Sequence, residues 1–386
     1  MKEGNFMNHG SYRETWVEVS LDAIEANVKS FKKHIQESSR LMAVVKADGY
    51  GHGAVEVAKA AIQSGADYLG VAFLDEALKL REAGISTPIL ILGYTPLAAV
   101  REAVKNDISI TIFTDESITE IKNAAEAFHK TVKVHLKIDS GMNRIGIRDQ
   151  QEALRICKII SASPGILLEG IFTHFADADN LDSTYTYKQF EHFTTIISYM
   201  EANDIDIPIK HCCNSAATIV YPEFHLDMVR VGISLYGLYP NDQLREKIQL
   251  KQAMSFKTKP VMIKRLEADQ PISYGCTYTP DKKSTIATLP VGYADGFSRQ
   301  LSNRGNVTVN GFRAPIVGRI CMDQTMIDVT EMTAINTNNI ITLFGDPNDG
   351  YISLGEVADQ MNTIHYEAAC LIGKRVPRIY VQNGLS

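Results

Sequence analysis

The chain has 386 residues, of which 45% are hydrophobic and 22% charged, a balance typical of a soluble globular protein of about two domains. Its net charge is −6 with scattered positive residues, which argues against a nucleic-acid partner. The N-terminal residues lack an apolar leader core, and no stretch approaches the ~18 apolar residues of a membrane span. We therefore expect a cytoplasmic protein with small ligands and no membrane partner.

The first predicted strand covers residues 14–20 and holds the single tryptophan, Trp16. We expect this strand to join the C-terminal domain. A helix is predicted after it, because apolar residues between Leu21 and Ile35 recur on one helical face.

From Leu41 onward, short apolar runs alternate with amphipathic helical stretches. The runs read LMAVVKA, YLGVAF, ILILGY, ISITIF, KVHLKI, LEGIFTHFA, IKHCCNSA and MVRVGISLYG. Such near-continuous hydrophobicity is typical of parallel strands buried on both faces, and no G-x-G-x-x-G follows the first run to favour a dinucleotide fold. Eight units of this kind predict an N-terminal (β/α)8 barrel of the TIM type over residues 1–240.

After about Asn241 the segments become strand-like with irregular connections. Asn310-Gly311 stands between two alternating stretches, which is a strong signal for a hairpin turn. We therefore predict a second, mostly β domain over residues 241–386.

Six cysteines are present, and their spacing does not match a metal-binding motif. Cys212 and Cys213 are neighbours within an apolar run. We expect all six to be reduced, buried thiols, and we expect no metal site.

Polar residues stand where the barrel strands are predicted to end, which is the face that carries active sites in this fold. The polar ones are Lys46, Lys137, Arg144, His174, Asn214, Ser215 and Arg230; Gly232 and Ile233 follow Arg230 in the eighth run. Any one alone would be typical of a snorkelling lysine or a satisfied histidine at a barrel rim. Five of the eight strands contribute, however, and their convergence indicates a site.

Lys46 follows a buried run and precedes the glycine-rich turn ADGYGHG. Apolar surroundings lower the pKa of a lysine, and the neutral amine can form a Schiff base with an aldehyde. Ser215, Gly232 and Ile233 follow strands seven and eight, where barrels commonly bind phosphate, although Gly232 could simply relieve crowding. A phosphorylated aldehyde would satisfy both ends, and pyridoxal 5'-phosphate is the candidate cofactor.

Motifs throughout both domains resemble those of the alanine racemase family. They are AVVKADGYGHGA, KIDSGMNRIGI, IFTHFADAD, NSAAT, VRVGISLYGLYP, ISYGCTYT, LPVGYADGFSR, VGRICMDQTMIDV and IHYEAACLIGKRVPRIY. The resemblance runs from TWVEVSLDAIEANV almost to the C-terminus. Small departures are Ser140 and Val231, where family members often have threonine and proline.

The resemblance implies two catalytic bases. Lys46 matches the lysine that holds the cofactor as an aldimine and acts on one face of the substrate, and Tyr274 in ISYG matches the tyrosine on the opposite face. Inversion of a stereocentre needs a group on each side of the carbon. Without the flanking motif, Tyr274 would be interpreted as a packed strand aromatic.

The resemblance also implies roles around the cofactor ring. Arg230 matches the arginine beside the pyridine nitrogen, where a permanent positive charge keeps that nitrogen unprotonated and limits transamination. His174 would hold Arg230 in place. Arg144 matches the residue that bonds the phenolic oxygen and the substrate region, and Lys137 matches a lysine that some family members carry as a carbamate.

Further contacts follow from the same resemblance. Those implied for the phosphate are Tyr50, Ser215, Gly232, Ile233 and Tyr366, with Asn214 nearby. Those implied for the substrate are Met322, Asp323 and an entrance-gate tyrosine, Tyr293. The family is homodimeric, and the C-terminal domain of one subunit completes the site of the other.

The function implied is alanine racemase: L- and D-alanine are interconverted by two-base proton transfer, supplying D-alanine for peptidoglycan. A serine or broad-specificity amino-acid racemase is the nearest alternative. A decarboxylase shares the two-domain plan but needs no base opposite Lys46. A cofactor-handling protein shares the barrel and the lysine but lacks a counterpart of residues 241–386.

Overall fold

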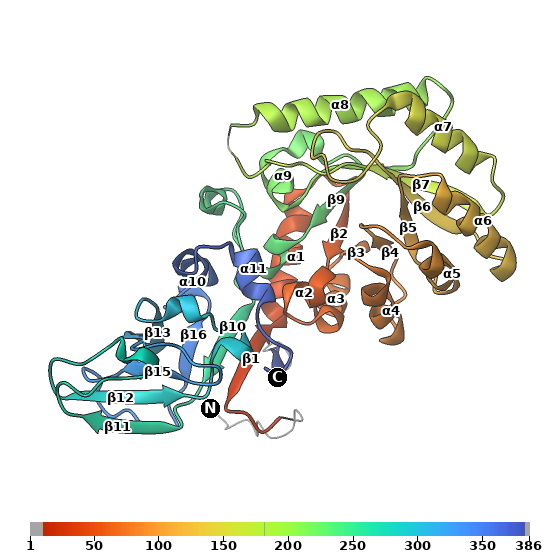
Figure 1. The fold of residues 1–386 in the computed structure, drawn as a ribbon. Coiled ribbons are helices and arrows are strands. Elements are labelled where there is room, and N and C mark those ends of the chain that lie inside the picture. Colours follow the sequence, from red (N-terminus) through yellow and green to blue (C-terminus); the bar gives the residue numbers. More distant parts are fainter. Residues whose placement is uncertain (1–10, 181, 383–386) are drawn as a thin grey trace. The chain divides into compact units, whose positions relative to one another are not determined.

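The protein is described by a computed structural model that covers residues 11–180 and 182–382. The chain divides into two compact units. The barrel unit comprises residues 24–49 and 54–250, and the C-terminal unit comprises residues 50–53 together with the described parts of 1–23 and 251–386. Figure 1 shows both units with their elements labelled.

The barrel unit is built on an eight-stranded parallel sheet with the order β8-β7-β6-β5-β4-β3-β2-β9. Its strands are β2 Arg40–Val44, β3 Tyr68–Val71, β4 Ile89–Ile91, β5 Ser109–Ile112, β6 Val132–Lys137, β7 Ile166–Phe172, β8 Ile209–His211 and β9 Met228–Val231. Two backbone hydrogen bonds link the edges, from Asp227 N–H to the Lys210 carbonyl and from Arg230 N–H to the Cys213 carbonyl, each 3.1 Å long. The sheet therefore nearly closes, and the predicted barrel is confirmed.

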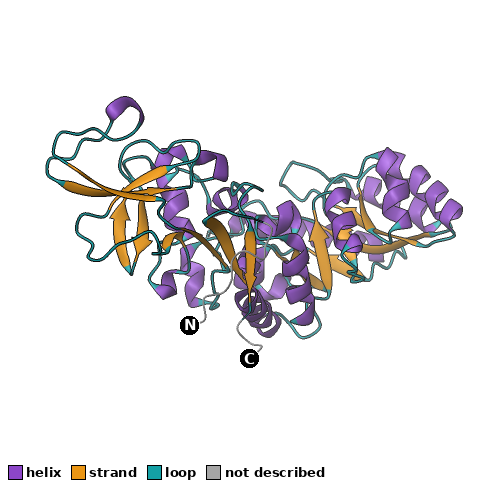
Figure 2. Cartoon of the chain, turned by 90° about the horizontal axis from the view of Figure 1, so that it is seen from below, coloured by secondary structure: helices purple, strands orange, loops and turns teal. Residues whose placement is uncertain are grey.

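Helices precede or connect the strands of this unit and lie outside the sheet (Figure 2). They are α1 Leu21–His34, which begins in the other unit, α2 Lys46–Tyr50, α3 Ala54–Gln63, α4 Leu74–Glu82, α5 Leu97–Lys105, α6 Glu116–Phe128, α7 Gln150–Ser161, α8 Thr184–Glu201 and α9 Ser215–Val220. Their starts follow local chemistry. Asp149, for example, accepts hydrogen bonds from the N–H groups of Gln151 and Glu152 and so caps α7.

The C-terminal unit contains a six-stranded sheet, β14-β13-β16-β10-β1-β17, and a three-stranded sheet, β11-β12-β15. The strands are β1 Thr15–Ser20, β10 Met254–Thr258, β11 Met262–Leu266, β12 Ser284–Leu289, β13 Asn306–Val309, β14 Phe312–Pro315, β15 Thr325–Asp328, β16 Ile341–Phe344 and β17 Arg378–Val381. Strand β1 lies between β10 and β17. Two helices, α10 Leu354–Gln360 and α11 His365–Cys370, accompany the sheets.

The predicted hairpin is confirmed between β13 and β14. Asn310 and Gly311 both have positive φ, 49° and 83°, as a two-residue turn of type I′ requires. Val309 and Phe312 are paired across it.

The expectation for the cysteines is partly wrong. All six are free thiols, but only Cys157, Cys212 and Cys213 are buried. Cys276 and Cys370 are exposed because they end a short 3-10 turn and helix α11 instead of lying in a strand. Cys321 is half-buried.

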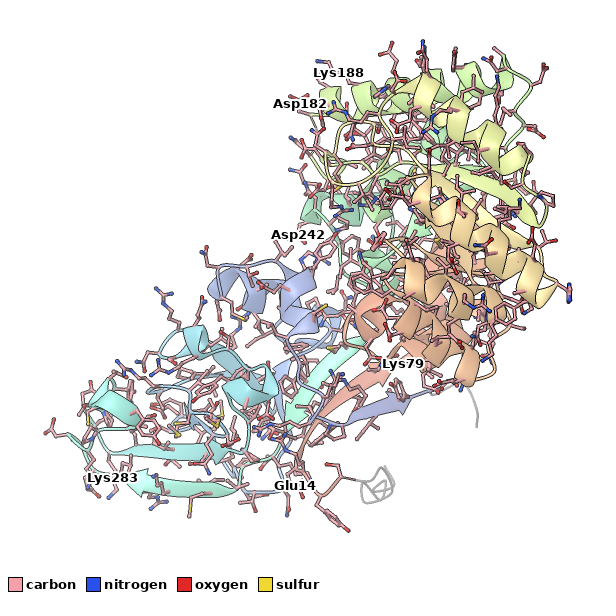
Figure 3. The ribbon with its side chains drawn as sticks, turned by 45° about the vertical axis from the view of Figure 1, so that its right-hand side comes forward. Glu14, Lys79, Asp182, Lys188, Asp242 and Lys283 are labelled. Atoms are coloured by element: carbon pink, nitrogen blue, oxygen red, sulfur yellow. The ribbon has the colours of Figure 1, made fainter. Side chains whose placement is uncertain are left out.

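Lys79, Lys188 and Lys283, which are labelled in Figure 3, are exposed. In the part of the chain that the structure describes, none of the helices has the length and apolarity needed to cross a membrane.

Candidate active site

Lys46 stands just beyond the carboxyl end of β2, at the start of a left-handed turn. Ala47, Asp48 and Gly49 have φ of 52°, 53° and 61°, a conformation that costs non-glycine residues roughly 1–2 kcal/mol each. The turn is held by Glu76, whose Oε1 accepts a hydrogen bond from Ala47 N–H at 2.6 Å. This strained backbone sets the direction in which Lys46 leaves the strand.

Arg230 on β9 is the centre of a buried polar cluster. Its Nη1 donates to His211 Nδ1 at 3.0 Å. Its Nη2 lies within hydrogen-bond distance of the Thr173 and Cys212 carbonyls and of His174 Nδ1, at 2.8, 3.0 and 3.2 Å. The guanidinium is therefore fixed by four acceptors and is 4% exposed.

The two histidines at Arg230 are held neutral. Burial first, and then the charge of Arg230, lower the pKa of His211 and of His174 well below the usual value. Burial also lowers the pKa of Arg230, to about 10, which leaves it charged near neutral pH. Neutral imidazoles offer the lone pairs that a charged guanidinium needs.

Lys137 ends β6 inside the barrel. Its Nζ lies 4.5 Å from the centroid of the Phe172 ring. Burial, with the charges of Arg230 and then Arg144 adding to it, lowers the pKa of Lys137 well below the usual value. Arg144 itself lies in an exposed position in the loop beyond β6.

Ser215, Gly232 and Ile233 come together after strands β8 and β9. The Ser215 hydroxyl accepts hydrogen bonds from the N–H groups of Gly232 at 2.9 Å and Ser234 at 3.4 Å. Asn214 caps α9 by accepting from Ala217 N–H at 3.0 Å. The expectation that the eighth strand holds Gly232 and Ile233 is wrong, because β9 ends at Val231 and Ile233 opens a 3-10 helix.

The C-terminal unit gathers its candidate residues around residues 319–323. Tyr293 N–H donates to the Cys321 carbonyl at 3.1 Å, and Ser273, next to Tyr274, donates through its hydroxyl to the Arg319 carbonyl at 2.6 Å. Tyr274, Met322 and Tyr293 are 71%, 53% and 43% exposed. This unit therefore presents two phenols and a methionine on one surface region.

Comparison with known proteins identifies the family. The chain matches the families "Alanine racemase, N-terminal domain" over residues 19–240 and "Alanine racemase, C-terminal domain" over residues 253–380. The chain belongs to the alanine racemase family. It is 61% identical over 376 residues to alanine racemase 2 of Oceanobacillus iheyensis, covering 97% of this chain and 95% of the relative.

Solved structures of this family agree with the fold. Alanine racemase from Bacillus anthracis with bound L-Ala-P has a TM-score of 0.91 at 42% identity, covering 97% of this chain and 96% of that one. A histidine racemase from Leuconostoc mesenteroides has a TM-score of 0.86 at 30% identity, covering 97% of this chain and all of that one.

Sequence reasoning missed several residues that contact candidate site residues in this member of the alanine racemase family. His211 is one, and its only sequence signal was a histidine at the end of a predicted strand. In the C-terminal unit, buried Asp295 accepts hydrogen bonds from Arg13 and Arg375, and Arg375 also donates to Asp323 at 2.5 Å. No local motif predicts this set, because Arg13 and Arg375 lie at opposite ends of the chain.

Tyr50 and Tyr366 form a pair within the C-terminal unit. Their ring centroids lie 6.4 Å apart with the planes inclined by 58°. Their predicted contact with phosphate stays a prediction. In the described residues, no group of histidine, cysteine and carboxylate side chains is arranged to hold a metal ion.

Proposed function

We propose that this chain is an alanine racemase that interconverts L- and D-alanine with pyridoxal 5'-phosphate and supplies D-alanine for peptidoglycan. The observation that carries the proposal is the match to both alanine racemase domains over nearly the whole chain. The proposed location is the cytoplasm.

The residues at the barrel strand ends fit this cofactor. The Ser215 hydroxyl and the Gly232 and Ile233 backbone would hold its phosphate, with Tyr50 and Tyr366 as further donors, and Lys46 would bind its aldehyde carbon. The fit rests on two observations. Gly232 N–H donates a hydrogen bond to the Ser215 hydroxyl, which places both residues together. Charged Arg230 is held in a fixed position by four acceptors. Pyridoxal phosphate supplies, when bound, an electron-withdrawing ring that acidifies the α-hydrogen of an attached amino acid.

Two side chains would move the proton. Once the amine of the substrate has displaced Lys46 from the aldehyde carbon, Lys46 as a neutral amine would remove the α-hydrogen from one face. The Tyr274 hydroxyl would return a proton to the other face, with the roles exchanged in the reverse direction. Arg144 and the Met322 backbone N–H would orient the substrate carboxylate, Asp323 would stand beside them, and Tyr293 would narrow the entrance.

We propose that Lys137 carries a carbamate. Burial and two neighbouring cations favour its neutral amine, which is the form that adds to carbon dioxide and releases a proton. The carbamate anion would then orient Arg144. ¹³C NMR spectra of protein equilibrated with ¹³C-bicarbonate test this idea. The native protein should show a carbamate carbonyl signal that is lost in Lys137→Ala, and a signal that persists in this variant would contradict the proposal.

We further propose a homodimer in which each C-terminal unit serves the barrel of its partner. This proposal is supported by the high exposure of Tyr274 and Met322 on the chain itself, because a proton-transferring phenol works best where water is excluded.

A racemase of broader specificity is the second candidate, and the structural similarity to a histidine racemase favours it. The test is deuterium incorporation at Cα when purified protein, pyridoxal phosphate and amino acid are incubated in D₂O. Alanine should exchange and invert much faster than serine, lysine or histidine, since each poorly fitting methylene costs roughly 1–3 kcal/mol. Equal rates on lysine would overturn the alanine assignment, and carbon dioxide release would overturn both candidates.

A further inference from the structure

A chain of buried hydrogen bonds continues from Arg230 into the interior of the barrel. Beyond the Arg230–His211 contact, His211 Nε2 lies 3.0 Å from His135 Nδ1. His135 Nε2 lies 3.1 Å from Glu169 Oε2. Arg230, His211, His135 and Glu169 are at most 8% exposed. Four side chains from four strands thus form one continuous polar path.

The chemistry at the two ends fixes the direction of every hydrogen bond. A guanidinium only donates and a carboxylate only accepts. His211 must therefore accept at Nδ1 from Arg230 and donate from Nε2. His135 must accept at Nδ1 and donate from Nε2 to Glu169. Both imidazoles are then neutral and both carry their proton on Nε2.

The far end of the path is anchored at the other mouth of the barrel. Glu169 Oε1 lies 2.6 Å from Lys133 Nζ, and Tyr68 donates to Glu169 Oε2 at 2.7 Å while lying 2.8 Å from the Ser109 hydroxyl. Burial alone would raise the pKa of Glu169, but the hydrogen bonds from His135, Lys133 and Tyr68 outweigh it and lower the pKa to about 2. Glu169 is therefore a permanent acceptor.

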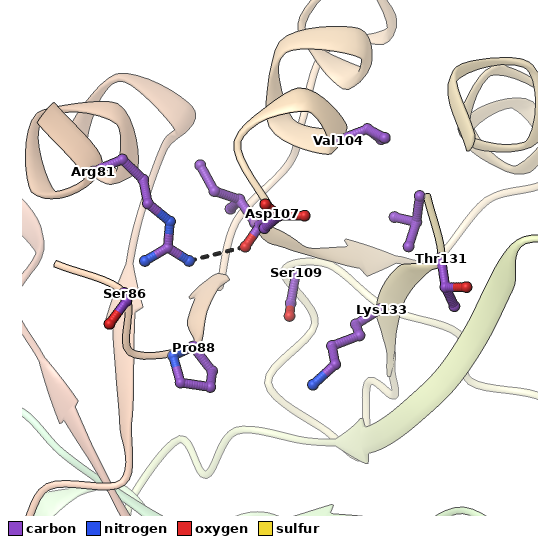
Figure 4. Close-up of a pocket in the computed structure, with 10 residues that line it drawn as sticks. Arg81, Ser86, Pro88, Val104, Asp107, Ser109, Thr131 and Lys133 are labelled. Carbon is purple, nitrogen blue, oxygen red and sulfur yellow. Dashed lines mark hydrogen bonds between the residues drawn. The ribbon is translucent and has the colours of Figure 1, made fainter. Parts of the chain in front are cut away.

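Lys133 and Ser109 also line a cavity of about 210 Å³ where strands β5 and β6 begin, together with Arg81 and Asp107 (Figure 4). Arg81 is committed to backbone carbonyls there, including that of Asp107 at 2.9 Å. The path thus crosses the barrel from the strand ends that hold Arg230 to the strand starts at this cavity.

The backbone is shaped to accommodate these side chains. The β6–β7 pairing shifts register between Val134 and His135, and Glu169 is the residue left over, which allows its side chain to reach the interior. A Cβ on Gly170 would lie 2.3 Å from His135 Nδ1. Gly170 therefore leaves the space that the imidazole of His135 occupies.

We propose that His135 and Glu169 are positioning residues for the reaction: the Glu169 carboxylate sets the Nε2–H tautomer of both histidines, which keeps the Nδ1 lone pair of His211 directed at Arg230. This inference rests on the proposed function for the role of Arg230 beside the cofactor. Without the carboxylate, only the Arg230 end still favours the Nε2–H tautomer, and whenever His211 takes the other tautomer its Nδ1–H faces the N–H of Arg230. Two donors oppose one another, and the guanidinium loses its fixed position.

Two pairs of variants test the proposal. Glu169→Gln replaces a group that only accepts with an amide whose NH₂ can also donate to His135 Nε2. His135→Leu breaks the path, whereas His135→Gln restores one acceptor and one donor at a similar spacing. The first readout is ¹⁵N–¹H correlation of imidazole nitrogens in ¹⁵N-histidine protein without added cofactor. In the native protein the His211 and His135 signals should show fixed Nε2–H tautomers. The His211 signal should become averaged in Glu169→Gln and His135→Leu and stay fixed in His135→Gln.

The second readout is racemase kinetics of the cofactor-loaded enzyme. Glu169→Gln and His135→Leu should lower kcat about tenfold to a hundredfold with KM changed less than threefold, and His135→Gln should recover most of kcat. Native tautomers in both disrupted variants would overturn the proposal, as would altered tautomers with an unchanged kcat. If Glu169→Gln fails to fold, the comparison of His135→Leu with His135→Gln tests the proposal by itself. An inactive native enzyme would overturn the proposed function instead. The tautomer spectra would still test whether the His211 tautomer depends on Glu169 and His135.

Discussion

Arg230 and His211 in the barrel unit are 4% and 0% exposed, whereas Tyr274 and Met322 in the C-terminal unit are 71% and 53% exposed. The first pair is satisfied by partners within its own unit. The second pair is held by backbone contacts around residues 319–323 and presents its side chains outward. The barrel residues are therefore held by their own unit, whereas the C-terminal unit presents exposed side chains, which agrees with the proposal that they serve another chain.

A subunit-mixing experiment tests most directly whether the C-terminal unit of one chain serves the barrel of another. Lys46→Ala and Tyr274→Phe should each lower kcat by about 10²- to 10⁴-fold, because each removes one of the two proton-transferring groups. Co-expressed, the two variants should regain about a quarter of native activity, since half of the dimers are mixed and each has one intact site. Each variant co-expressed with itself is the control. No recovery in isolated mixed dimers would show that the site is completed within one chain.

The neutral histidines of the barrel interior predict a stability that falls with acid. The pKa values of His135, His174 and His211 are lowered, chiefly by burial, so below pH about 6.5 the unfolded chain binds protons that the folded chain does not. The free energy of unfolding should then fall as the pH drops below that value, by up to about 1.4 kcal/mol per pH unit for each of the three histidines. Urea unfolding at pH 7, 6 and 5 measures the slope, and His135→Gln should reduce it by up to about a third. A flat profile over this range would contradict the prediction.

The space left by Gly170 gives a sharper test of the same interior. Gly170→Ala places a methyl group against His135 and the Ile209 carbonyl, and we expect a loss of about 1–3 kcal/mol in unfolding free energy. Gly355→Ala in α10 is the matched control, because a Cβ there meets only the Ser353 hydroxyl at 3.6 Å and alanine favours a helix. Equal stabilities of the two variants would show that the strand accommodates the methyl group.

The mildest change is predicted at Ser215, a candidate phosphate contact. Ser215→Ala should weaken pyridoxal phosphate binding about fivefold to tenfold, since one hydrogen bond contributes a net of roughly 1.0–1.4 kcal/mol. Titration of the cofactor-free protein by visible absorbance measures this. Ser163→Ala, whose hydroxyl bonds only to the Ile159 carbonyl in α7, is the control and should bind as the native protein does.

Much of the fold could be predicted because it depends on local patterns. Eight buried apolar runs with helical stretches between them predicted the barrel. Asn310-Gly311 predicted a hairpin of the C-terminal unit, since a turn with two positive φ values favours those residues. The strand-end rule likewise pointed to Lys46, Arg230 and Ser215 without knowledge of the structure.

What the sequence determined by itself was the set of elements, the family and the candidate residues at strand ends, because these depend on periodicity and on short motifs. Only the tertiary structure decided that His211, His135 and Glu169 form one path. Alternation along β7 would direct Glu169 away from the interior, and the register shift beside His135 is set by pairing between strands. The contacts of Asp295 with Arg13 and Arg375 were likewise decided only by the tertiary structure. These arginines lie 282 and 80 residues from Asp295 in the sequence, and no local pattern predicts such long-range contacts.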